Sequence, residues 1–304
     1  GCYRIEAAQY DVKVVSTNRA PSYPYRGYGP PPHNFVLESL MDIAARGLGL
    51  DTAEIRRRNY IRPDQFPYTI PSGNEYDSGN YEAALDKVLE MADYRRLREE
   101  QARARAEGRL VGIGVASTIE PGVFDWNAYA TVGVPGVGVP EGVSLGINVM
   151  GEITVRVGFN LQGQGQYTLA AQLLADYFGV EMSAVRVVYA DTDNAPPHFG
   201  PGGSRLGVAI SGAILGACHT ITEKLRRVAA VLLQAPFEQV ELMDGMLRVR
   251  GVPGAQMPMA QVVGALLSRS DLLPPGMEAS ASTTSVWTAP GRTAPDEDGR
   301  CKSY

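Results

Sequence analysis

The sequence predicts an α+β fold with mixed sheets and packed helices. Helical periodicity and strand-like alternation occur along the same chain, and residues 153–233 follow a strand–helix–strand–helix order. The 34 glycines and 21 prolines indicate many tight turns rather than an all-helical body. The 304 residues, 44% of them hydrophobic, suffice for about two domains.

The first 60 residues predict a strand followed by two helices. Residues 8–18 alternate as a strand would, and a proline-rich loop over 19–33 follows. A helix is predicted to begin near Asn34, a suitable N-cap, and a short helix is predicted to follow with Asp51 or Thr52 as its cap. The arginines at 56–58 are interpreted as a solvated or packing face rather than a basic patch.

The middle of the chain changes from helical to β texture. Residues 62–80, rich in Pro, Gly, Asn and Asp, predict a linker or an ordered arm with a domain boundary. Helices are predicted over 81–91 and 95–107, the second so charged that it should lie on the surface. From Leu110 onward the predicted strands are 111–118, 128–134, 143–149 and 153–159.

The C-terminal half continues with alternating elements. A helix at 168–179, a strand at 185–190 and a long helix over 206–233 are predicted. Small apolar residues at the start of the long helix indicate close packing against another element or a cofactor. A two-residue turn at 244–245 predicts a hairpin, whereas the periodicity over 252–304 is too weak to predict an element.

Charge and cysteine usage exclude several function classes. The net charge of −5 argues against a nucleic-acid-binding protein. Cys2, Cys218 and Cys301 form no C-x-x-C pair, so neither a zinc nor an iron–sulfur site is expected, and a reducing, cytoplasmic location is the default. No apolar run approaches the roughly 20 residues that a membrane helix needs. The chain does not begin with Met, so we expect a piece of a longer or processed polypeptide.

Three glycine-rich turns are the candidate binding sites. We call residues 25–30 the first turn, 163–166 the second turn and 199–205 the third turn. The second turn follows a predicted strand and opens a predicted helix, where glycines permit close backbone approach and N–H groups favour an anion. It has neither the spacing of the G-x-G-x-x-G dinucleotide motif nor the lysine of a P-loop.

In order and spacing, these turns resemble those of the molybdenum hydroxylases. This family includes xanthine dehydrogenase, aldehyde oxidase and aerobic carbon monoxide dehydrogenase, and the likeness is to the large subunit that carries molybdopterin. It covers most of residues 3–235, including a family-like V-x-x-x-D-T-D pattern at 187–193. The residues that match the family's cofactor-binding loops are Arg26, Gly27 and Tyr28, then Gly163, Gln164 and Gly165, then Gly203, Ser204 and Arg205.

The resemblance implies a role for each turn. Gln164 would hydrogen-bond the pterin or dithiolene side of the cofactor, and Ser204 would serve its phosphate end. Arg26 would contact oxo or pterin groups, and Tyr28 would stack on a flat substrate. The residues alone leave other readings open, in which Arg26 pairs with a surface carboxylate, Tyr28 belongs to the core and Ser204 is a helix N-cap.

The resemblance also implies how the chain relates to a complete subunit. Residues 1–62 would end a first molybdopterin-binding domain, 63–109 would form a linker and helical arm, and 110–304 would be the larger part of a second domain. The family's general base is a glutamate in a Gly-Glu motif near the subunit's C-terminus, and this chain stops at Tyr304 before that motif. We therefore expect the isolated piece to be inactive and to hold little or no cofactor.

The implied parent is a hydroxylase of an aldehyde or an aromatic N-heterocycle, with water as the oxygen source. Its cofactor would be molybdopterin, a cytosine dinucleotide being one possible form, and its partners an iron–sulfur subunit and an FAD subunit. The first turn lacks the copper-binding cysteine of the carbon monoxide enzymes, so carbon monoxide is not the expected substrate. The rivals are a non-catalytic interaction module and a binder of another phosphate-bearing ligand.

No metal site is predicted directly from the side chains. His33, His198 and His219 place no two ligands on one helical turn. Asp191 and Asp193 alternate at a strand end and could bind a divalent ion, but turn formation and capping are favoured. Glu120 could equally line a cavity or lie on the surface.

Overall fold

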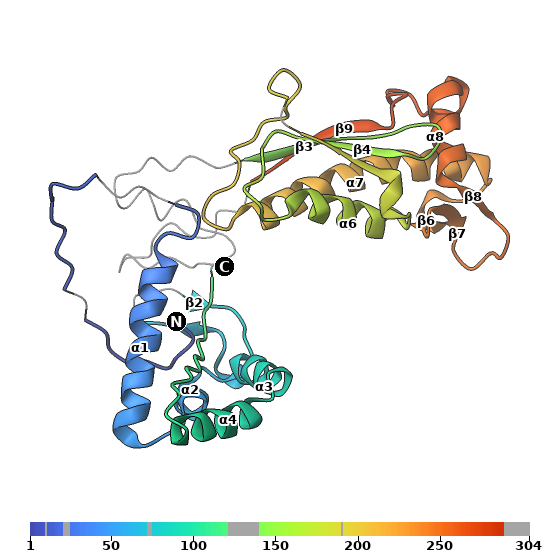
Figure 1. The fold of residues 1–304 in the computed structure, drawn as a ribbon. Helices are drawn as coiled ribbons and strands as arrows, with labels where there is room; N and C mark the ends of the chain where they lie inside the picture. Colours follow the sequence, from blue (N-terminus) through green and yellow to red (C-terminus); the bar gives the residue numbers. More distant parts are fainter. Residues whose placement is uncertain (10, 21–24, 72–74, 121–139, 190, 289–304) are drawn as a thin grey trace. The chain divides into compact units, whose positions relative to one another are not determined.

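The computed structural model describes residues 1–9, 11–20, 25–71, 75–120, 140–189 and 191–288 (Figure 1). These residues form two compact units, which we call unit 1, within residues 1–120, and unit 2, within residues 140–288. Both helices and mixed sheets are present, which confirms the α+β prediction. Residues 63–109 belong to unit 1, while the assignment of 1–62 and 110–304 to two cofactor-binding domains stays a prediction.

Unit 1 is mainly helical. It contains helices α1 (Pro30–Leu48), α2 (Thr52–Asn59), α3 (Tyr81–Met91) and α4 (Tyr94–Ala106), the 3₁₀ turn η1 (Pro63–Gln65), and the short antiparallel strands β1 (Tyr68–Thr69) and β2 (Glu75–Tyr76). Helix α3 contacts both α2 and α4. The helices predicted at 81–91 and 95–107 are confirmed, and most of α4 is exposed, as its charge indicates.

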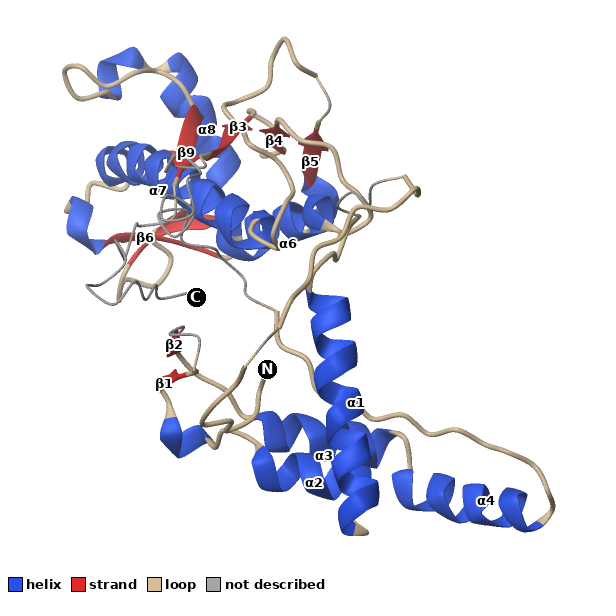
Figure 2. Ribbon diagram, turned by 90° about the vertical axis from the view of Figure 1, so that its left-hand side faces the viewer, coloured by secondary structure: helices blue, strands red, loops and turns tan. Residues whose placement is uncertain are grey.

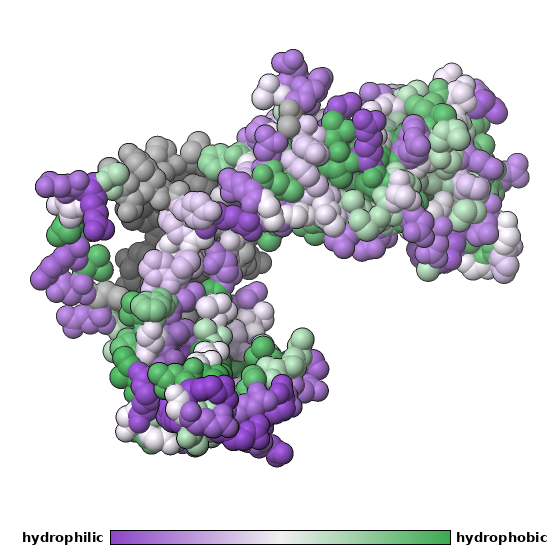
Figure 3. Space-filling model, in the orientation of Figure 1, coloured by the Kyte–Doolittle hydropathy of each residue, from purple (hydrophilic) through white to green (hydrophobic). Residues whose placement is uncertain are grey.

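Helix α1 begins earlier than the sequence predicts. Its N-cap residue is Gly29 and its first residue is Pro30, so the predicted cap at Asn34 is wrong. Proline suits the first helical turn because its φ is already helical and its missing N–H would have no partner there. Phe35, Val36 and Leu40 are more than half exposed, and Figure 3 shows hydrophobic surface along this helix.

Two predicted strands of unit 1 do not form. Val12 and Val14 are strongly exposed, and residues 11–20 pair with no strand in the part of the chain that the structure describes. Residues 113–120 alternate in burial, but they form no ladder with any described residue. Alternation shows which side chains could share a face, whereas a strand also needs a partner for its backbone groups. The strand predicted at 128–134 lies outside the described residues.

A buried arginine joins the helices of unit 1. Arg56 is fully buried, and its guanidinium pairs with Glu38 (2.8 Å) and Asp42 (2.9 Å). Glu38 also accepts hydrogen bonds from the Tyr3 hydroxyl (2.7 Å) and the Ser117 amide (3.0 Å). The packing interpretation of the arginines is therefore confirmed for Arg56, which connects α2 to α1.

Unit 2 is a sheet covered by helices, with a small second sheet. Its elements are β3 (Glu141–Ile147), β4 (Ile153–Val157), α6 (Gln166–Phe178), η2 (Met182–Ala184), β5 (Val185–Val188), α7 (Leu206–Leu232), η3 (Phe237–Gln239), β6 (Val240–Met243), β7 (Met246–Val249), β8 (Gln256–Pro258), α8 (Met259–Ser268), η4 (Ser270–Leu272) and β9 (Ser282–Trp287). The predicted hairpin turn is confirmed, with Asp244 and Gly245 both at positive φ.

The main sheet has the strand order β5-β4-β3-β9. Strands β4 and β5 are parallel and connected through α6, whereas β3 is antiparallel to both β4 and β9. Helices α6 and α7 lie on the same face of this sheet (Figure 2). Strand β9 and helix α8 come from the region whose weak periodicity predicted no element.

The small residues near the start of α7 pack against strands, so the element that they approach closely is the main sheet. Ala209, Ala213 and Ala217 are buried, and a Cβ added to Gly212 would lie 2.5 Å from the Trp287 ring of β9. A Cβ on Gly216 would likewise lie 2.5 Å from the Ser285 hydroxyl. The side chains on this face of α7 are small because the helix and sheet backbones come close together.

Helix α7 also corrects one expectation from the sequence. By length and composition alone it is long and apolar enough to cross a membrane, although no such stretch was expected. Its residues Ile210, Ile214 and Leu225 are fully buried in the core of unit 2. A buried core helix meets the same length and hydropathy criterion, and packing accounts for the composition of α7.

Candidate functional site

The second turn opens helix α6 with an unusual backbone. Gly163 (φ 93°) and Gly165 (φ 84°) are both in conformations that favour glycine, and Gly165 is the N-cap residue. The Gln164 side-chain oxygen accepts a hydrogen bond from the Gln162 amide (2.6 Å). Gln166, the first residue of α6, has a buried side-chain oxygen with no hydrogen-bond partner among the described residues.

Aromatic rings fix the second turn to the ends of two strands. The Tyr167 hydroxyl donates to the Phe159 carbonyl (2.9 Å), just beyond β4. The Tyr167 ring stacks on Tyr189, just beyond β5, with centroids 4.1 Å apart. Stacking and a hydrogen bond on one side chain restrict the start of α6 to one position relative to the sheet.

The third turn precedes helix α7 and has several left-handed residues. Gly200 (φ 91°), Gly203 (φ 57°) and Ser204 (φ 56°) all have positive φ. Ser204 is the exceptional one, because a side chain disfavours this conformation. Helix α7 has Arg205 as its N-cap residue, so Ser204 lies one position before the cap.

The structure brings the starts of α6 and α7 together, and with them the second and third turns: a Cβ on Gly207 of α7 would lie 3.9 Å from the Leu169 side chain of α6. A Cβ on Gly158, at the end of β4, would lie 2.1 Å from the His198 ring, and one on Gly200 would lie 3.8 Å from Phe159. His198 therefore packs against the strand end that leads into the second turn. Two of the three predicted turns are neighbours at one end of unit 2, whereas the first turn belongs to unit 1, and its place beside them stays a prediction.

The first turn is exposed on unit 1. Arg26, Gly27 and Tyr28 are all exposed, and Gly27 has a φ of 90°. Tyr28 is 67% exposed, so the interpretation of Tyr28 as a core residue is wrong. The Tyr28 amide donates to the Tyr25 carbonyl (2.8 Å), which closes the turn.

Sequence reasoning missed Glu141, which holds the third turn. Glu141 is fully buried, and its carboxylate oxygen Oε2 pairs with the Arg205 guanidinium at 3.0 Å. The same oxygen accepts from the amides of Phe199 (3.4 Å) and Gly200 (3.3 Å). A signal was present: Glu141 stands in register with Val143 and other apolar residues on the buried face of β3, where an acid is unexpected.

The acidic pair after β5 forms a turn. One Asp191 oxygen accepts from the Asp193 amide (3.0 Å) and the other from the Asn194 side chain (2.8 Å). These hydrogen bonds, first that from Asn194, hold the pKa of Asp191 below its ordinary value. Across the described ranges no group of three or more His, Cys, Asp or Glu side chains could hold a metal ion. The turn interpretation is confirmed.

The remaining candidate side chains are placed as follows. His219 lies within α7 with its ring beside Tyr177, and His33 is exposed on α1. Glu120 is exposed, which fits the surface reading.

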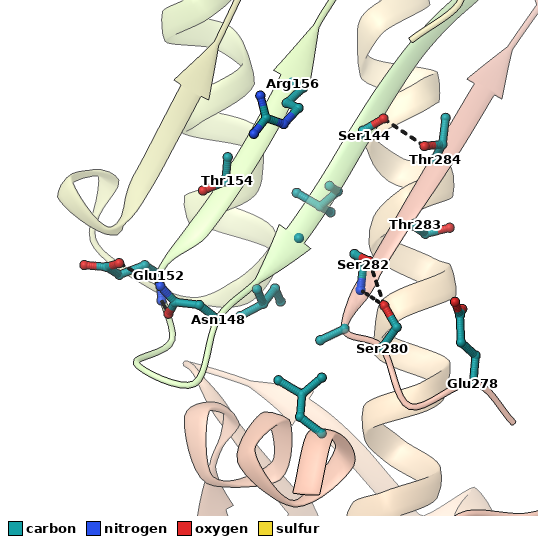
Figure 4. Close-up of a pocket in the computed structure, with 15 residues that line it drawn as sticks. Ser144, Asn148, Glu152, Thr154, Arg156, Glu278, Ser280, Ser282, Thr283 and Thr284 are labelled. Carbon is teal, nitrogen blue, oxygen red and sulfur yellow. Dashed lines mark hydrogen bonds between the residues drawn. The ribbon is translucent and has the colours of Figure 1, made fainter. Parts of the chain in front are cut away.

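A cavity of about 720 Å³ lies on the sheet face that α6 and α7 leave uncovered (Figure 4). Several hydroxyl side chains line it, including Ser144 hydrogen-bonded to Thr284 (2.8 Å), with Arg156 on the neighbouring strand. It is lined by none of the nine predicted site residues. The candidate site therefore remains at the two turns.

Comparisons with known proteins agree with this arrangement. A family model described as "Molybdopterin cofactor-binding domain" matches residues 87–304, and another with the same description matches residues 1–60. The nicotine 6-hydroxylase large subunit of Paenarthrobacter nicotinovorans is 32% identical over 94% of this chain and 35% of its own length. The carbon monoxide dehydrogenase large chain of Hydrogenophaga pseudoflava is 35% identical over 92% of this chain and 35% of its own length.

A solved structure shares the fold. The crystal structure of quinoline 2-oxidoreductase from Pseudomonas putida 86 superposes with a TM-score of 0.74 at 34% identity, over 84% of this chain and 32% of that one. The chain thus spans about a third of the length of these relatives. With family models that match most of its length, the chain belongs to the molybdopterin cofactor-binding family of the molybdenum hydroxylases and corresponds to part of their large subunit.

Proposed function

We propose that this chain forms part of the cofactor site of an oxidoreductase, a molybdenum hydroxylase that uses water as its oxygen source. One observation carries the proposal. The second and third turns, which the family likeness assigns to the pterin and to the phosphate end, are neighbours where α6 and α7 begin.

The residues present fit a large anionic cofactor. The N-cap residues of α6 and α7 make no side-chain capping hydrogen bond, and helix starts offer N–H groups and a positive dipole end. A Cβ built on Gly165 or Gly202 would meet nothing within 4 Å, so the backbone there is open to a ligand. The unpartnered Gln166 oxygen adds a buried acceptor for a ligand N–H.

Each turn would contribute a different contact. When bound, the cofactor supplies the two-electron oxidation of a C–H bond and passes the electrons onward. Gln164 would hydrogen-bond its pterin side, and the backbone around Gly203 and Ser204 would bind its phosphate end. Arg205 is 3% exposed and already bonded to Glu141, so it would act by supporting the third turn. Arg26, Gly27 and Tyr28 would join from the first turn.

The finer proposals follow from the relatives and from the sequence. A nicotine hydroxylase and a quinoline oxidoreductase are among the relatives, which supports an aromatic N-heterocycle as substrate, with an aldehyde as the alternative. The absence of cysteine from the first turn, which reads Tyr-Arg-Gly-Tyr-Gly, argues against carbon monoxide. The partners we propose are an iron–sulfur subunit and an FAD subunit. The free thiols of Cys2 and Cys218 support a reducing, cytoplasmic location.

The test is to express the full reading frame with its neighbouring subunits and to measure molybdenum and pterin per subunit, including any cytosine dinucleotide. We expect both groups, and we expect quinoline or benzaldehyde to be hydroxylated with ¹⁸O from labelled water. Folded protein that lacks both groups would favour an interaction module or a binder of another phosphate-bearing ligand.

The 304-residue chain alone gives a second test. We propose that it holds little or no cofactor and has no hydroxylase activity, because it spans only about a third of the length of its relatives. Stoichiometric molybdenum or turnover in the purified chain would contradict this.

A further inference from the structure

We propose that Glu141 is a positioning residue of the cofactor site. Through Arg205 and two backbone amides it holds the third turn in its bound geometry, and it thereby sets how firmly the site retains its phosphate-bearing ligand. This inference rests on the proposed function for its ligand, but its geometry stands on unit 2 alone.

All described bonds of the Glu141 carboxylate go to one segment. Its Oε2 accepts from the Arg205 guanidinium (3.0 Å) and from the amides of Phe199 (3.4 Å) and Gly200 (3.3 Å). Arg205 also bonds within this segment, because its Nη1 donates to the Gly200 carbonyl (2.6 Å). The Arg205 guanidinium lies 5.5 Å from the centre of the Phe199 ring. Strand β3 is thereby connected to both ends of the third turn.

The burial of this pair is hard to explain by stability. Glu141 is fully buried and its other oxygen, Oε1, has no hydrogen-bond partner among the described residues. An apolar residue in register with Val143 would fill the same space without removing a charge from water. A buried ion pair is often no more stabilising than an apolar pair of similar volume, so fixing one geometry is the better explanation.

The third turn needs such support because its backbone is strained. Ser204 has a φ of 56° between Gly203 and the buried Arg205, a conformation that persists only where surrounding contacts impose it. Gly142, the residue after Glu141, also meets this segment: a Cβ there would lie 2.6 Å from the Pro197 carbonyl oxygen. The start of β3 therefore supports the whole stretch that leads to Ser204.

The experiment uses the protein expressed from its full reading frame. Two variants are compared with the wild type: Glu141→Gln, and the double variant Glu141→Gln with Arg205→Met. The double variant removes both charges, so its thermal stability should stay close to that of the wild type even if the single variant folds poorly. The control is Glu241→Gln, which takes a carboxylate from Arg248 and Arg250 in the β6–β7 hairpin, away from the turn.

Two measurements are made on each protein: amide hydrogen exchange over residues 198–206, and molybdenum and pterin content per subunit. In the double variant we expect exchange at Phe199 and Gly200 to accelerate about ten- to a hundredfold, as expected for lost charge-assisted hydrogen bonds. We expect cofactor content after dialysis to fall about tenfold, as for other residues that orient a ligand shell. Glu241→Gln should change neither quantity.

A double variant that is stable but keeps wild-type exchange and cofactor content would overturn the inference, and so would equal losses in Glu241→Gln. Faster exchange without loss of cofactor would show that Glu141 orders the turn but does not set retention, which also contradicts it. A wild type without molybdenum and pterin would remove the proposed function and the retention role together. The exchange data would then still decide whether Glu141 positions the turn.

Discussion

Gln164 shows how much a single residue contributes to the second turn. Its side chain lies between two glycines with positive φ and accepts a hydrogen bond from the Gln162 amide. The side-chain amide of Gln164 also has N–H donors, which can bond a ligand. Gln164 thus links the conformation of the turn to any molecule bound over it.

Replacing Gln164 with Ala within the full-length protein should lower cofactor retention about tenfold, because one ligand contact and one turn contact are lost together. Molybdenum and pterin content after dialysis measures this. The matched control is Gln256→Ala on β8, where the side chain is exposed. Unchanged loading in Gln164→Ala would remove this residue from the site.

Asp42 gives a pH-dependent prediction for unit 1. Burial opposes its ionisation, but hydrogen bonds from Thr52 and Arg56 outweigh burial and hold the pKa of Asp42 below its ordinary value of 3.8. A carboxylate with a lowered folded-state pKa stabilises the fold above its unfolded pKa, and this contribution is lost as the pH falls through the folded value. Asp42→Asn should therefore flatten the fall in stability below about pH 4. Unfolding midpoints at pH 2–6 measure it, and parallel curves for both proteins would contradict it.

At the scale of elements, Gly179 of α6 and Gly264 of α8 differ in whether the structure has room for a side chain. Gly179 caps α6 at a φ of 66°, and a Cβ there would lie 2.4 Å from the Asp244 Cα. The end of α6 therefore touches the β6–β7 turn. Gly264, inside α8, has open space around it.

Gly179→Ala should destabilise the protein by about 2–4 kcal/mol, since it adds left-handed strain and a backbone clash. Gly264→Ala should stabilise it by about 0.5–1 kcal/mol, because alanine favours a helix interior. Urea unfolding followed by circular dichroism measures both. Equal effects of the two substitutions would show that the contact at Gly179 is absent in solution.

Local pattern was sufficient for some elements and not for others. Helices α2, α3, α4, α6 and α7 follow from periodicity and caps such as Asp51, whose side chain accepts from the Ala53 amide (2.8 Å). Strand β9 was missed because its Ser- and Thr-rich sequence resembles a loop. It becomes a strand by pairing with β3, as Ser144 with Thr284 shows. The strand predicted at residues 8–18 is the opposite case. Its sequence alternates as a strand would, but residues 11–20 have no partner strand among the described residues.

At the scale of the whole molecule, the described part of each unit buries one thiol. Cys2 lies in the small core of unit 1 and Cys218 in the much larger core of unit 2. Burial raises the pKa of the Cys2 thiol to about 11 and that of Cys218 to about 12. Because the thiolate is the reactive form, both should resist alkylation in the native protein.

In a Cys301→Ser background, iodoacetamide at pH 8 should label neither thiol without denaturant. As urea rises, Cys2 should be labelled at a lower concentration than Cys218, since unit 1 buries less apolar surface and has a smaller core to lose. Peptide mass spectrometry distinguishes the two sites. Coincident midpoints would show that the two units unfold as one.

The sequence by itself determined the glycine-rich turns, the helices that follow them and the family to which they point. These features depend on local backbone preferences, which neighbouring residues in the chain largely set. Tertiary structure alone decided that the second and third turns are neighbours and that Glu141 holds Arg205. The partner of a buried charge depends on which strands and turns become adjacent in the folded chain, and residues 64 positions apart carry no local signal of that contact.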